Sequence, residues 1–422
     1  MTMATAEAVR KAAGFKCRFC GGGDASTFAD LGTSPLVQSF LEAGRLHAME
    51  PFYPLHARVC HACLLVQLDE FVAPAEIFSE YAYFSSFSDA WIAHAARYAE
   101  RMRERLRLGA GSLVVEIASN DGYLLRHFAA AGVPVLGIEP AANVARAAVE
   151  AGVRSDVSFH SRANAARIVR EFGQADLVIG NNVLAHVPDL NDFVAGLKQL
   201  MKPGAVLTTE FPHLQRLIEE NQFDTIYHEH FSYFSFSTAV RVFAAHGLTL
   251  FDVEELPTHG GSIRIHGRHA DDQTKPPTER VARMRAQERQ LGLEDLATYR
   301  RFDERVKATK RDILAFLIDL KRRGKTIVGY GAPGKGNTLL NYCGIRTDFL
   351  DYTVDRNPYK QGRFTPGTRI PIHAPERIRE TRPDCVLILP WNWRDEIVEQ
   401  MAYIREWGGR FAVPIPRPHL LP

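Results

Sequence analysis

Long apolar runs and a strong excess of one charge are both missing from this sequence. None of its apolar stretches approaches the ~20 residues that span a bilayer. The opening segment, MTMATAEAVRKAAGF, has no apolar core of a secretory signal, so we expect a cytoplasmic protein. A net charge of +2 indicates no general attraction to nucleic acid or to a membrane surface. We therefore expect a soluble globular protein with no membrane, nucleic-acid or obligatory protein partner. A length of 422 residues favours two to four domains.

Cysteine is scarce, with 6 residues in the whole chain, which is too few for a disulfide framework at this length. Four of them form the pairs Cys17-x-x-Cys20 and Cys60-x-x-Cys63. Each pair can place two thiolates on one tetrahedral ion, which predicts a single zinc site. Four cysteine ligands leave no position for water, so the zinc is expected to be structural. A pair of redox dithiols is the alternative, without a thioredoxin-like context to favour it.

Glycine is missing where a dinucleotide-binding turn needs it. Leu113–Ile117 is a short apolar run typical of a buried parallel strand, and a helix is predicted from Tyr123 to Ala131. This strand, turn and helix form the opening unit of a doubly wound α/β sheet. The turn between them carries Ser119 and Asn120 in place of G-x-G-x-x-G. The unit therefore favours S-adenosylmethionine, which has no phosphate, over a dinucleotide.

Acidic residues stand near the ends of the first two predicted strands. Glu116 lies near the carboxyl end of the first, and the second, Pro134–Ile138, ends at Glu139. An acid about 20 positions after the turn can bind the hydroxyls of a ribose. An α/β unit with an incidental acid is the alternative. The residues predicted to bind S-adenosylmethionine are Glu116, Ala118, Ser119, Asn120, Gly122, Tyr123, Leu124, Glu139, Pro140, Asn181 and Asn182.

The α/β alternation continues to about residue 270. Further strands are predicted near 154–158 and at Asp176–Asn181, Val206–Glu210, Thr249–Glu254 and Ser262–His266. The last two resemble a closing antiparallel pair, so the seven strands fit a class I methyltransferase sheet.

The segment Gln222–Ser235 is dense in histidine, tyrosine and carboxylate and has no clear apolar period. Loops of this kind on a rigid sheet usually carry function. The spacing H-E-x-x-H is absent, which favours acid–base chemistry over a metal site. A buried polar network is the remaining alternative.

The last third of the chain predicts a helical connection and a second α/β lobe. Residues 275–323 are charged and helical, and their charges are expected to face solvent. Thr326–Tyr330 then leads into Gly329-x-Gly331-x-x-Gly334-Lys335-Gly336, a phosphate-cradle pattern between a strand and a helix. Glycines that serve only packing are the alternative. Three more strands are predicted at 350–354, 385–389 and 411–413.

The predicted fold is α/β, with an N-terminal zinc-binding domain (1–75), a central class I, Rossmann-like methyltransferase domain (76–270), and a helical linker with a C-terminal Rossmann-like domain (271–422).

Several motifs together resemble those of the sugar-nucleotide C-methyltransferases. They are the two C-x-x-C pairs, E-I-A-S-N-D-G-Y-L-L, N-N-V-L-A-H-V-P, Y-H-E-H-F-S-Y-F-S, H-G-G-S-I-R and G-Y-G-A-P-G-K-G-N, in the family's order over nearly the whole chain. The resemblance implies S-adenosylmethionine-dependent methylation of C-3, or in some relatives C-5, of a 4-keto-6-deoxysugar bound to dTDP. An NAD-dependent sugar-nucleotide oxidoreductase and a zinc-ribbon binding module are the alternatives from other classes.

Carried onto this sequence, the family's general base falls on His230. Its expected companions are Tyr227, Glu229, His186 and Tyr81. Residue chemistry agrees, because a histidine can take the α-proton of a ketone near neutral pH and Tyr or His donors can stabilise the enolate. If His230 is not the base, His228 or His186 is the next candidate. The residues predicted to bind the dTDP-sugar are His259, Gly260, Gly261, Gly331, Lys335 and Asn337.

Overall fold

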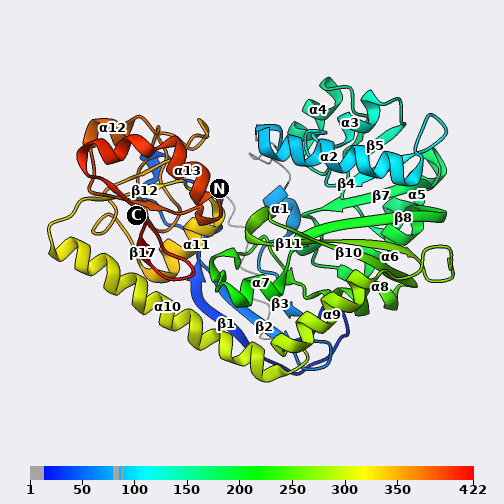
Figure 1. The fold of residues 1–422 in the computed structure, drawn as a ribbon, viewed down its shortest axis with the longest axis horizontal. Helices are drawn as coiled ribbons and strands as arrows, with labels where there is room; N and C mark the ends of the chain where they lie inside the picture. Colours follow the sequence, from blue (N-terminus) through cyan, green and yellow to red (C-terminus); the bar gives the residue numbers. More distant parts are fainter. Residues whose placement is uncertain (1–13, 79–84, 88) are drawn as a thin grey trace, which may run out of the picture.

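The computed structural model describes residues 14–78, 85–87 and 89–422, which form three β-sheets. A large lobe built on a seven-stranded sheet lies at the right of Figure 1, and a smaller C-terminal lobe lies at the left. The long helix α10 (Leu296–Arg322) runs beneath the C-terminal lobe to the lower middle of the view, next to the N-terminal strands. Among the described residues, no helix is long and apolar enough to cross a membrane.

The seven-stranded sheet has the order β10-β11-β8-β7-β4-β5-β6. Its strands are β4 (Val114–Ile117), β5 (Val135–Ile138), β6 (Ser155–Asp156), β7 (Ala175–Asn181), β8 (Met201–Pro212), β10 (Leu248–Leu256) and β11 (Ser262–His269). The strands from β6 to β8 are parallel, whereas β11 pairs antiparallel with both β8 and β10. This is the order of a class I methyltransferase sheet, and the predicted fold is confirmed.

Helices cover both faces of this sheet because its central strands are apolar on both sides. Val114 packs with the helices of one face and its neighbour Val115 with those of the other. The first face carries α2 (Asp89–Leu106), α3 (Leu125–Ala130) and α4 (Ala142–Glu150). The second carries α5 (Arg162–Phe172), α6 (Leu190–Leu200), α8 (Phe236–Ala245) and α9 (Glu279–Leu291).

The N-terminal sheet contains a strand from the middle of the chain. Its order is β1-β2-β3-β9, with β1 (Ala25–Ser34), β2 (Tyr53–Cys60), β3 (Val66–Gln67) and β9 (Ser232–Tyr233). β9 belongs to the His- and Tyr-rich segment, and Tyr233 pairs with Val66. The cysteine-rich unit and this segment are therefore one structure. The sequence did not predict this contact, because a two-residue strand has no period to detect.

The C-terminal sheet has the order β14-β13-β12-β15-β16-β17, parallel except for β17. Its strands are β12 (Ile327–Tyr330), β13 (Thr353–Val354), β14 (Ile372–His373), β15 (Cys385–Ile388), β16 (Arg410–Val413) and β17 (His419–Leu420). Its helices are α11 (Gly334–Cys343), α12 (Arg377–Thr381) and α13 (Arg394–Gln400). The two-residue strands β14 and β17 were not predicted, for the same reason as β9.

The predicted helical connection exists as α9 and α10, but its charges do not all face solvent. Glu288 of α9 is fully buried and accepts hydrogen bonds from His213 Nε2 at 2.7 Å and from Ser237 N at 2.8 Å. The prediction of a solvated face was wrong at this position. On α10, Phe302 stacks on Phe28 of β1 with ring centroids 4.5 Å apart. The same apolar core continues into α11, so α10 joins the N-terminal sheet to the C-terminal lobe.

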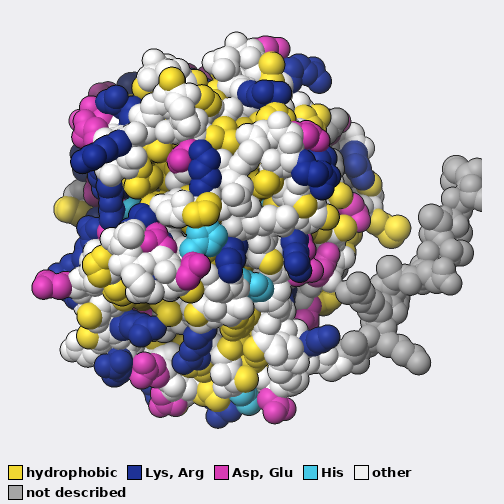
Figure 2. Space-filling view, turned by 90° about the vertical axis from the view of Figure 1, so that its right-hand side faces the viewer, with side chains coloured by type: hydrophobic (Ala, Val, Ile, Leu, Met, Phe, Trp, Pro, Cys, Tyr) yellow, Lys and Arg dark blue, Asp and Glu magenta, His cyan; other side chains and the backbone are white. Residues whose placement is uncertain are grey.

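The surface carries both charge signs side by side. Figure 2 shows Lys and Arg side chains interspersed with Asp and Glu over the face that it presents. That face carries no extended patch of one sign, in keeping with the near balance of 51 Lys and Arg against 49 Asp and Glu in the whole chain.

Candidate active site

A cavity of ≈ 770 Å³ lies at the carboxyl ends of the parallel strands, where α/β sheets bind ligands, and reaches the C-terminal lobe. The predicted site residues that line it are Ala118, Asn120, Tyr123, Glu139, Pro140, Asn181, Asn182, His186, Tyr227, Glu229, His230, His259 and Lys335. Those that do not are Glu116, Ser119, Gly122, Leu124, Gly260, Gly261, Gly331 and Asn337. Tyr81 lies outside the described residues.

The turn after β4 has an unusual backbone. Ala118, Asn120 and Gly122 have φ angles of 54°, 50° and 74°, in the left-handed region. Such strain at a non-glycine residue persists where the surroundings over-determine it, and it clusters at functional sites. Ser119 is buried beneath β5, where a Cβ on Gly137 would lie 2.3 Å from its Oγ. The turn therefore presents Ala118 and Asn120 to the cavity and uses Ser119 for packing.

Glu139, at the end of β5, holds this turn in place. Its two carboxylate oxygens accept hydrogen bonds from the backbone N–H groups of Asn120 and Ala141, both at 2.9 Å. Burial raises the pKa of Glu139, and these two hydrogen bonds oppose that rise. Each oxygen keeps a second lone pair for a ribose hydroxyl. The residues present therefore fit the adenosine part of S-adenosylmethionine.

Glu116 has a different environment from Glu139. Its side chain is buried, and one carboxylate oxygen has no hydrogen-bond partner in the described part of the chain. Burial, with the nearby charges of Glu139 and Asp121, raises its pKa well above the usual range. Glu116 thus lies behind the cavity wall, in surroundings that favour its protonated form.

His230 is held by the main chain of its own segment. Its Nδ1–H donates to the carbonyl of Thr225 at 2.9 Å, in the 3-10 turn η4 (Phe223–Thr225). The ring lies 4.1 Å from the Tyr227 ring and 4.8 Å from the His186 ring, between centroids. Burial lowers the pKa of His230 well below its usual value, and His186 adds to this. The ring is therefore neutral, and because Nδ1 carries the proton, the lone pair is on Nε2.

His186 enters the same cavity from the turn after β7, η3 (Leu184–His186). Its Nδ1–H donates to the carbonyl of Glu229 at 2.7 Å, and burial lowers its pKa to about 4. Burial also raises the pKa of the Glu229 carboxyl to about 7. Two neutral imidazoles and one carboxyl that titrates near neutrality therefore meet at one wall.

His228, the other histidine of the segment, faces away from the cavity. Its Nε2–H donates to the carbonyl of Pro54 at 3.1 Å, and its ring meets Tyr53 edge-on at 5.8 Å. It contacts the N-terminal sheet and does not line the cavity. The expectation that it is a reserve base was therefore wrong; Glu229 is better placed.

The glycine-rich loop after β12 is packed largely against protein. A Cβ on Gly331 would lie 2.6 Å from Pro390, and one on Gly336 would lie 3.0 Å from Leu389. The backbone N–H of Ala332 donates to Asp355 at 2.8 Å, so a protein carboxylate occupies this donor. Lys335 and Gly334 at the start of α11 still line the cavity. The loop thus contributes Gly334 and Lys335 to the cavity, while Gly331 and Gly336 serve packing.

Two further residues of the C-terminal lobe refine the predicted site. Asn337 is buried and donates to the carbonyl of Val37 at 2.7 Å, so it joins the lobe to the N-terminal sheet. Lys360 lines the cavity and donates to the carbonyl of Ala332 at 2.9 Å. No sequence pattern pointed to Lys360, because this residue follows a two-residue strand inside a long loop.

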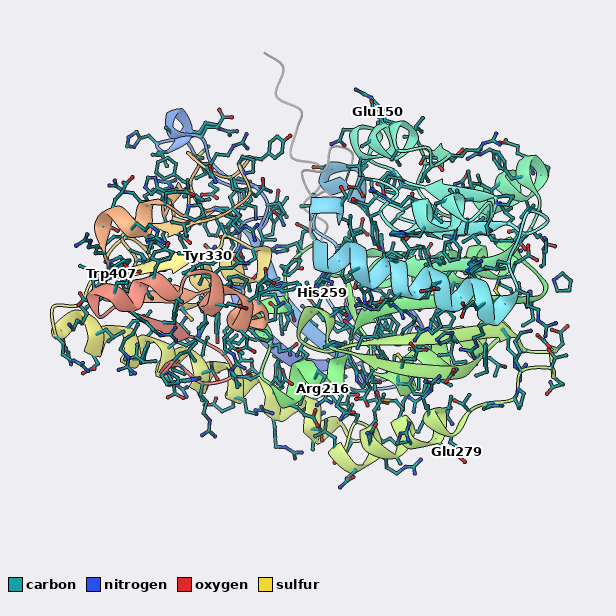
Figure 3. The ribbon with its side chains drawn as sticks, turned by 45° about the horizontal axis from the view of Figure 1, so that its top comes forward. Glu150, Arg216, His259, Glu279, Tyr330 and Trp407 are labelled. Carbon is teal, nitrogen blue, oxygen red and sulfur yellow. The ribbon has the colours of Figure 1, made fainter. Side chains whose placement is uncertain are left out.

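The H-G-G turn lies between the lobes, and Figure 3 shows His259 there. His259 has a φ of 55° and lines the cavity, and burial lowers its pKa to about 4. A Cβ on Gly260 would lie 2.7 Å from the Trp391 ring, and one on Gly261 would lie 2.6 Å from Arg216. Gly260 therefore allows close approach of the C-terminal lobe, and both glycines line a second cavity of ≈ 590 Å³.

The four paired cysteines come together in the N-terminal unit. Sγ atoms of Cys17 and Cys63 lie 3.5 Å apart, as do those of Cys20 and Cys60, and all four lie within 4.8 Å of one another. Four sulfurs bound at about 2.3 Å to one tetrahedral zinc lie about 3.8 Å apart. The donor set and its spacing fit one zinc, with no ligand position left for water.

The sheet order, the acid-held turn and the four-cysteine unit define a class I methyltransferase with an N-terminal zinc-binding unit. Family models agree: a zinc binding domain matches residues 17–78, a methyltransferase domain 91–253 and a C-methyltransferase C-terminal domain 257–416. The C-methyltransferase NovU of Streptomyces niveus is 37% identical over 411 residues, covering 96% of each chain. The chain therefore belongs to the C-methyltransferase family and is an S-adenosylmethionine-dependent C-methyltransferase.

Other similarities cover part of the chain. The ubiquinone biosynthesis O-methyltransferase of Rhodopseudomonas palustris (strain HaA2) is 29% identical over 114 residues, 27% of this chain and 45% of that protein. Magnesium protoporphyrin IX methyltransferase of Synechocystis PCC 6803, solved with bound S-adenosylmethionine, is 15% identical over 42% of this chain and 81% of its own, with a TM-score of 0.32. A Mesorhizobium loti methyltransferase is 14% identical over 42% and 100%, with a TM-score of 0.34.

Proposed function

We propose that this enzyme methylates C-3 of a dTDP-linked 4-keto-6-deoxysugar in the cytoplasm, as a step of deoxysugar biosynthesis for an antibiotic. His230 is the general base. The observation that supports this most directly is its hydrogen bond to Thr225 O at 2.9 Å, in the cavity that also holds Glu139. Because a carbonyl oxygen can only accept, this bond keeps the ring proton on Nδ1 and leaves the lone pair of Nε2 for the substrate.

The arrangement of groups suits carbon methylation. A ketone acidifies the hydrogen on the adjacent carbon, and Nε2 of His230 takes that proton. Tyr227 and His186, next to the His230 ring, are placed to stabilise the enolate oxygen. Bound S-adenosylmethionine supplies the electrophilic methyl group. The cavity between the lobes sets the position of the enolate carbon, on which the rate depends steeply.

The C-terminal lobe supplies the cations for the diphosphate. Lys335 and Lys360 both line the cavity, and both are half-buried. A lysine ammonium in such a setting suits a phosphate group. The packing of Gly331 against Pro390 argues against a dinucleotide on this loop, because that role needs bare backbone at the first glycines. A sugar nucleotide therefore fits better than NAD.

The base is tested by exchange of the substrate's α-proton in D2O, with S-adenosylhomocysteine in place of the methyl donor. His230→Asn should abolish exchange and lower kcat for methylation by about two to four orders of magnitude, the usual contribution of a general base. His228→Asn is the matched control, since His228 contacts Pro54 outside the cavity.

Exchange at the wild-type rate in His230→Asn would place the base elsewhere. Glu229 would then be tested first, because burial brings its pKa to about 7. The substrate is tested by turnover of a panel of dTDP-4-keto-6-deoxysugars, with NMR of each product to locate the methyl group. Methylation at C-5 would refute the assignment of C-3 and leave the base assignment intact.

A further inference from the structure

The turn that holds His230 is itself bound by a tryptophan of the C-terminal lobe. Trp391 begins the 3-10 turn η6 (Trp391–Trp393), and its Nε1–H donates to Asp224 Oδ2 at 2.7 Å. Both side chains are buried. Asp224 lies in η4, next to Thr225, whose carbonyl accepts the hydrogen bond of His230. One peptide unit therefore separates the two hydrogen bonds.

Further contacts fix both sides of this arrangement. Thr338 of α11 donates through Oγ1 to the carbonyl of Ile226 at 3.3 Å. Gln222 donates to the carbonyl of Gly260 at 2.6 Å, and Gly260 itself packs under the Trp391 ring. The C-terminal lobe and the H-G-G turn thus hold η4 from either end.

Asp224 depends on Trp391 more than a surface carboxylate would. Its other oxygen, Oδ1, is buried and has no hydrogen-bond partner among the described residues. Burial raises its pKa to about 6, against the opposing effects of Lys335 and of the Trp391 bond. Lys335 and the backbone N–H groups of Asp224 and Thr225 also stabilise the carboxylate. Removing the indole donor would leave a second buried carboxylate oxygen without its side-chain partner, and the turn would have to shift to satisfy it.

We propose that Asp224 and Trp391 are positioning residues: the C-terminal lobe fixes η4 through this hydrogen bond, so that the Thr225 carbonyl holds His230 with its proton on Nδ1. The expected effect on kcat rests on the proposed role of His230 as the base. The expected effect on the His230 tautomer does not depend on that role. The C-terminal lobe therefore contributes to catalysis beyond binding the sugar nucleotide.

The test is Trp391→Phe, which keeps the apolar ring and removes the donor. In protein labelled with 15N-histidine, the His230 signals are those absent from His230→Asn. Wild-type enzyme should show one tautomer, protonated at Nδ1; Trp391→Phe should show a mixture. With the dTDP-4-keto-6-deoxysugar that the wild-type enzyme methylates, kcat should fall about tenfold to a hundredfold, the scale expected when a catalytic group is slightly displaced. The affinity for S-adenosylhomocysteine should not change.

Trp407→Phe is the matched control. Its Nε1–H donates to the carbonyl of Pro383 at 3.0 Å within the C-terminal lobe. Figure 3 shows Trp407 at the far side of that lobe from His259. This variant should keep the single tautomer and the wild-type kcat. Asp224→Asn retains a carbonyl oxygen for Trp391 and should recover most of the activity that Asp224→Leu loses.

An unchanged His230 tautomer and kcat in Trp391→Phe would overturn the proposal, as would an equal loss in Trp407→Phe, which would indicate general weakening of the lobe. A tautomer shift in Trp391→Phe, together with full activity of His230→Asn, would instead support the positioning and refute the base.

Discussion

Burial acts in opposite directions on two adjacent residues of the cavity wall. It raises the pKa of Glu229 to about 7 and lowers that of His230 well below its usual value. Both changes follow from one cause, because a poorly solvated site disfavours a charge of either sign. A neutral imidazole is the form that can accept a proton, so burial keeps His230 ready for the role proposed here.

The titration of Glu229 should appear in the pH dependence of stability. Between pH 4.5, its ordinary pKa, and about 7, the folded protein retains a proton that the unfolded chain releases. Stability from this group is therefore lost as pH rises through that window. Glu229→Gln should remove the loss, so that its free energy of unfolding relative to wild type rises by up to about 1.4 kcal/mol per pH unit.

Urea denaturation of the protein without substrate, from pH 4.5 to 7.5, measures this difference. Glu150→Gln is the control, because Glu150 is exposed at the end of α4, at the outer edge of the molecule in Figure 3. Parallel curves for wild type and Glu229→Gln would contradict the prediction.

Glu139 should determine the affinity for the cofactor. Glu139→Ala is expected to weaken binding of S-adenosylmethionine by about 1.5–3 kcal/mol, the scale of hydrogen bonds to a charged group. Glu139 also holds the turn through Asn120 N, so Glu139→Gln separates loss of charge from loss of shape. Isothermal titration calorimetry measures the effect, and unchanged affinity in Glu139→Ala would refute the assignment.

At the level of secondary-structure elements, β9 gives the zinc unit a connection to the proposed base. Ser232 pairs with Gln67 and Tyr233 with Val66, two and three residues after His230. β3, which contributes those partners, begins just after Cys63. A structural metal in one unit thereby supports the position of a segment that is far away in the sequence.

Loss of the zinc should therefore abolish activity as well as unfold the N-terminal sheet. Binding energy on the order of 10 kcal/mol contributes to folding at such sites. Elemental analysis should find one zinc per chain in wild type and in Cys343→Ala, a buried cysteine outside the cluster, and little in Cys60→Ser. Folded, active protein without metal would disprove this.

On the scale of the whole molecule, the cavity lies between the two lobes, and residues of both lobes line it. The seven-stranded sheet contributes Glu139 and the C-terminal lobe contributes Lys335, and α10 packs with the N-terminal sheet and with α11 in one apolar core. The cofactor is thus expected to contact the lobe of the seven-stranded sheet, and the substrate to contact both lobes, with its sugar at His230 and its diphosphate at Lys335. The division into three domains stays a prediction, and the shared core indicates that they fold against one another.

Lys335→Ala should raise KM for the dTDP-sugar about tenfold or more, the scale of a charge-assisted hydrogen bond, and leave S-adenosylmethionine affinity unchanged. Lys325→Ala is the control, because Lys325 pairs with Asp384 outside the cavity. Titration of NAD in parallel tests the alternative function. An unchanged KM, or tight NAD binding, would refute the assignment.

The sequence alone determined the large sheet, the donor set for zinc and the class of cofactor. Strands such as Val114–Ile117 carry apolar runs, and Cys17, Cys20, Cys60 and Cys63 lie at short spacings, so local patterns specify both. Glu139 was also recognisable, because its distance from the first turn follows from the length of one strand–helix–strand unit.

Only the tertiary structure decided which of these residues meet. It directs His228 toward Pro54 and His230 toward the cavity, although the two differ by only two positions. It packs Pro390 against Gly331 of the glycine-rich loop and places the Asp355 carboxylate on the backbone N–H of Ala332. It also pairs β9 with β3 and brings Trp391 to Asp224. These contacts join residues far apart in the chain, and they depend on how separate elements pack, which no local period records.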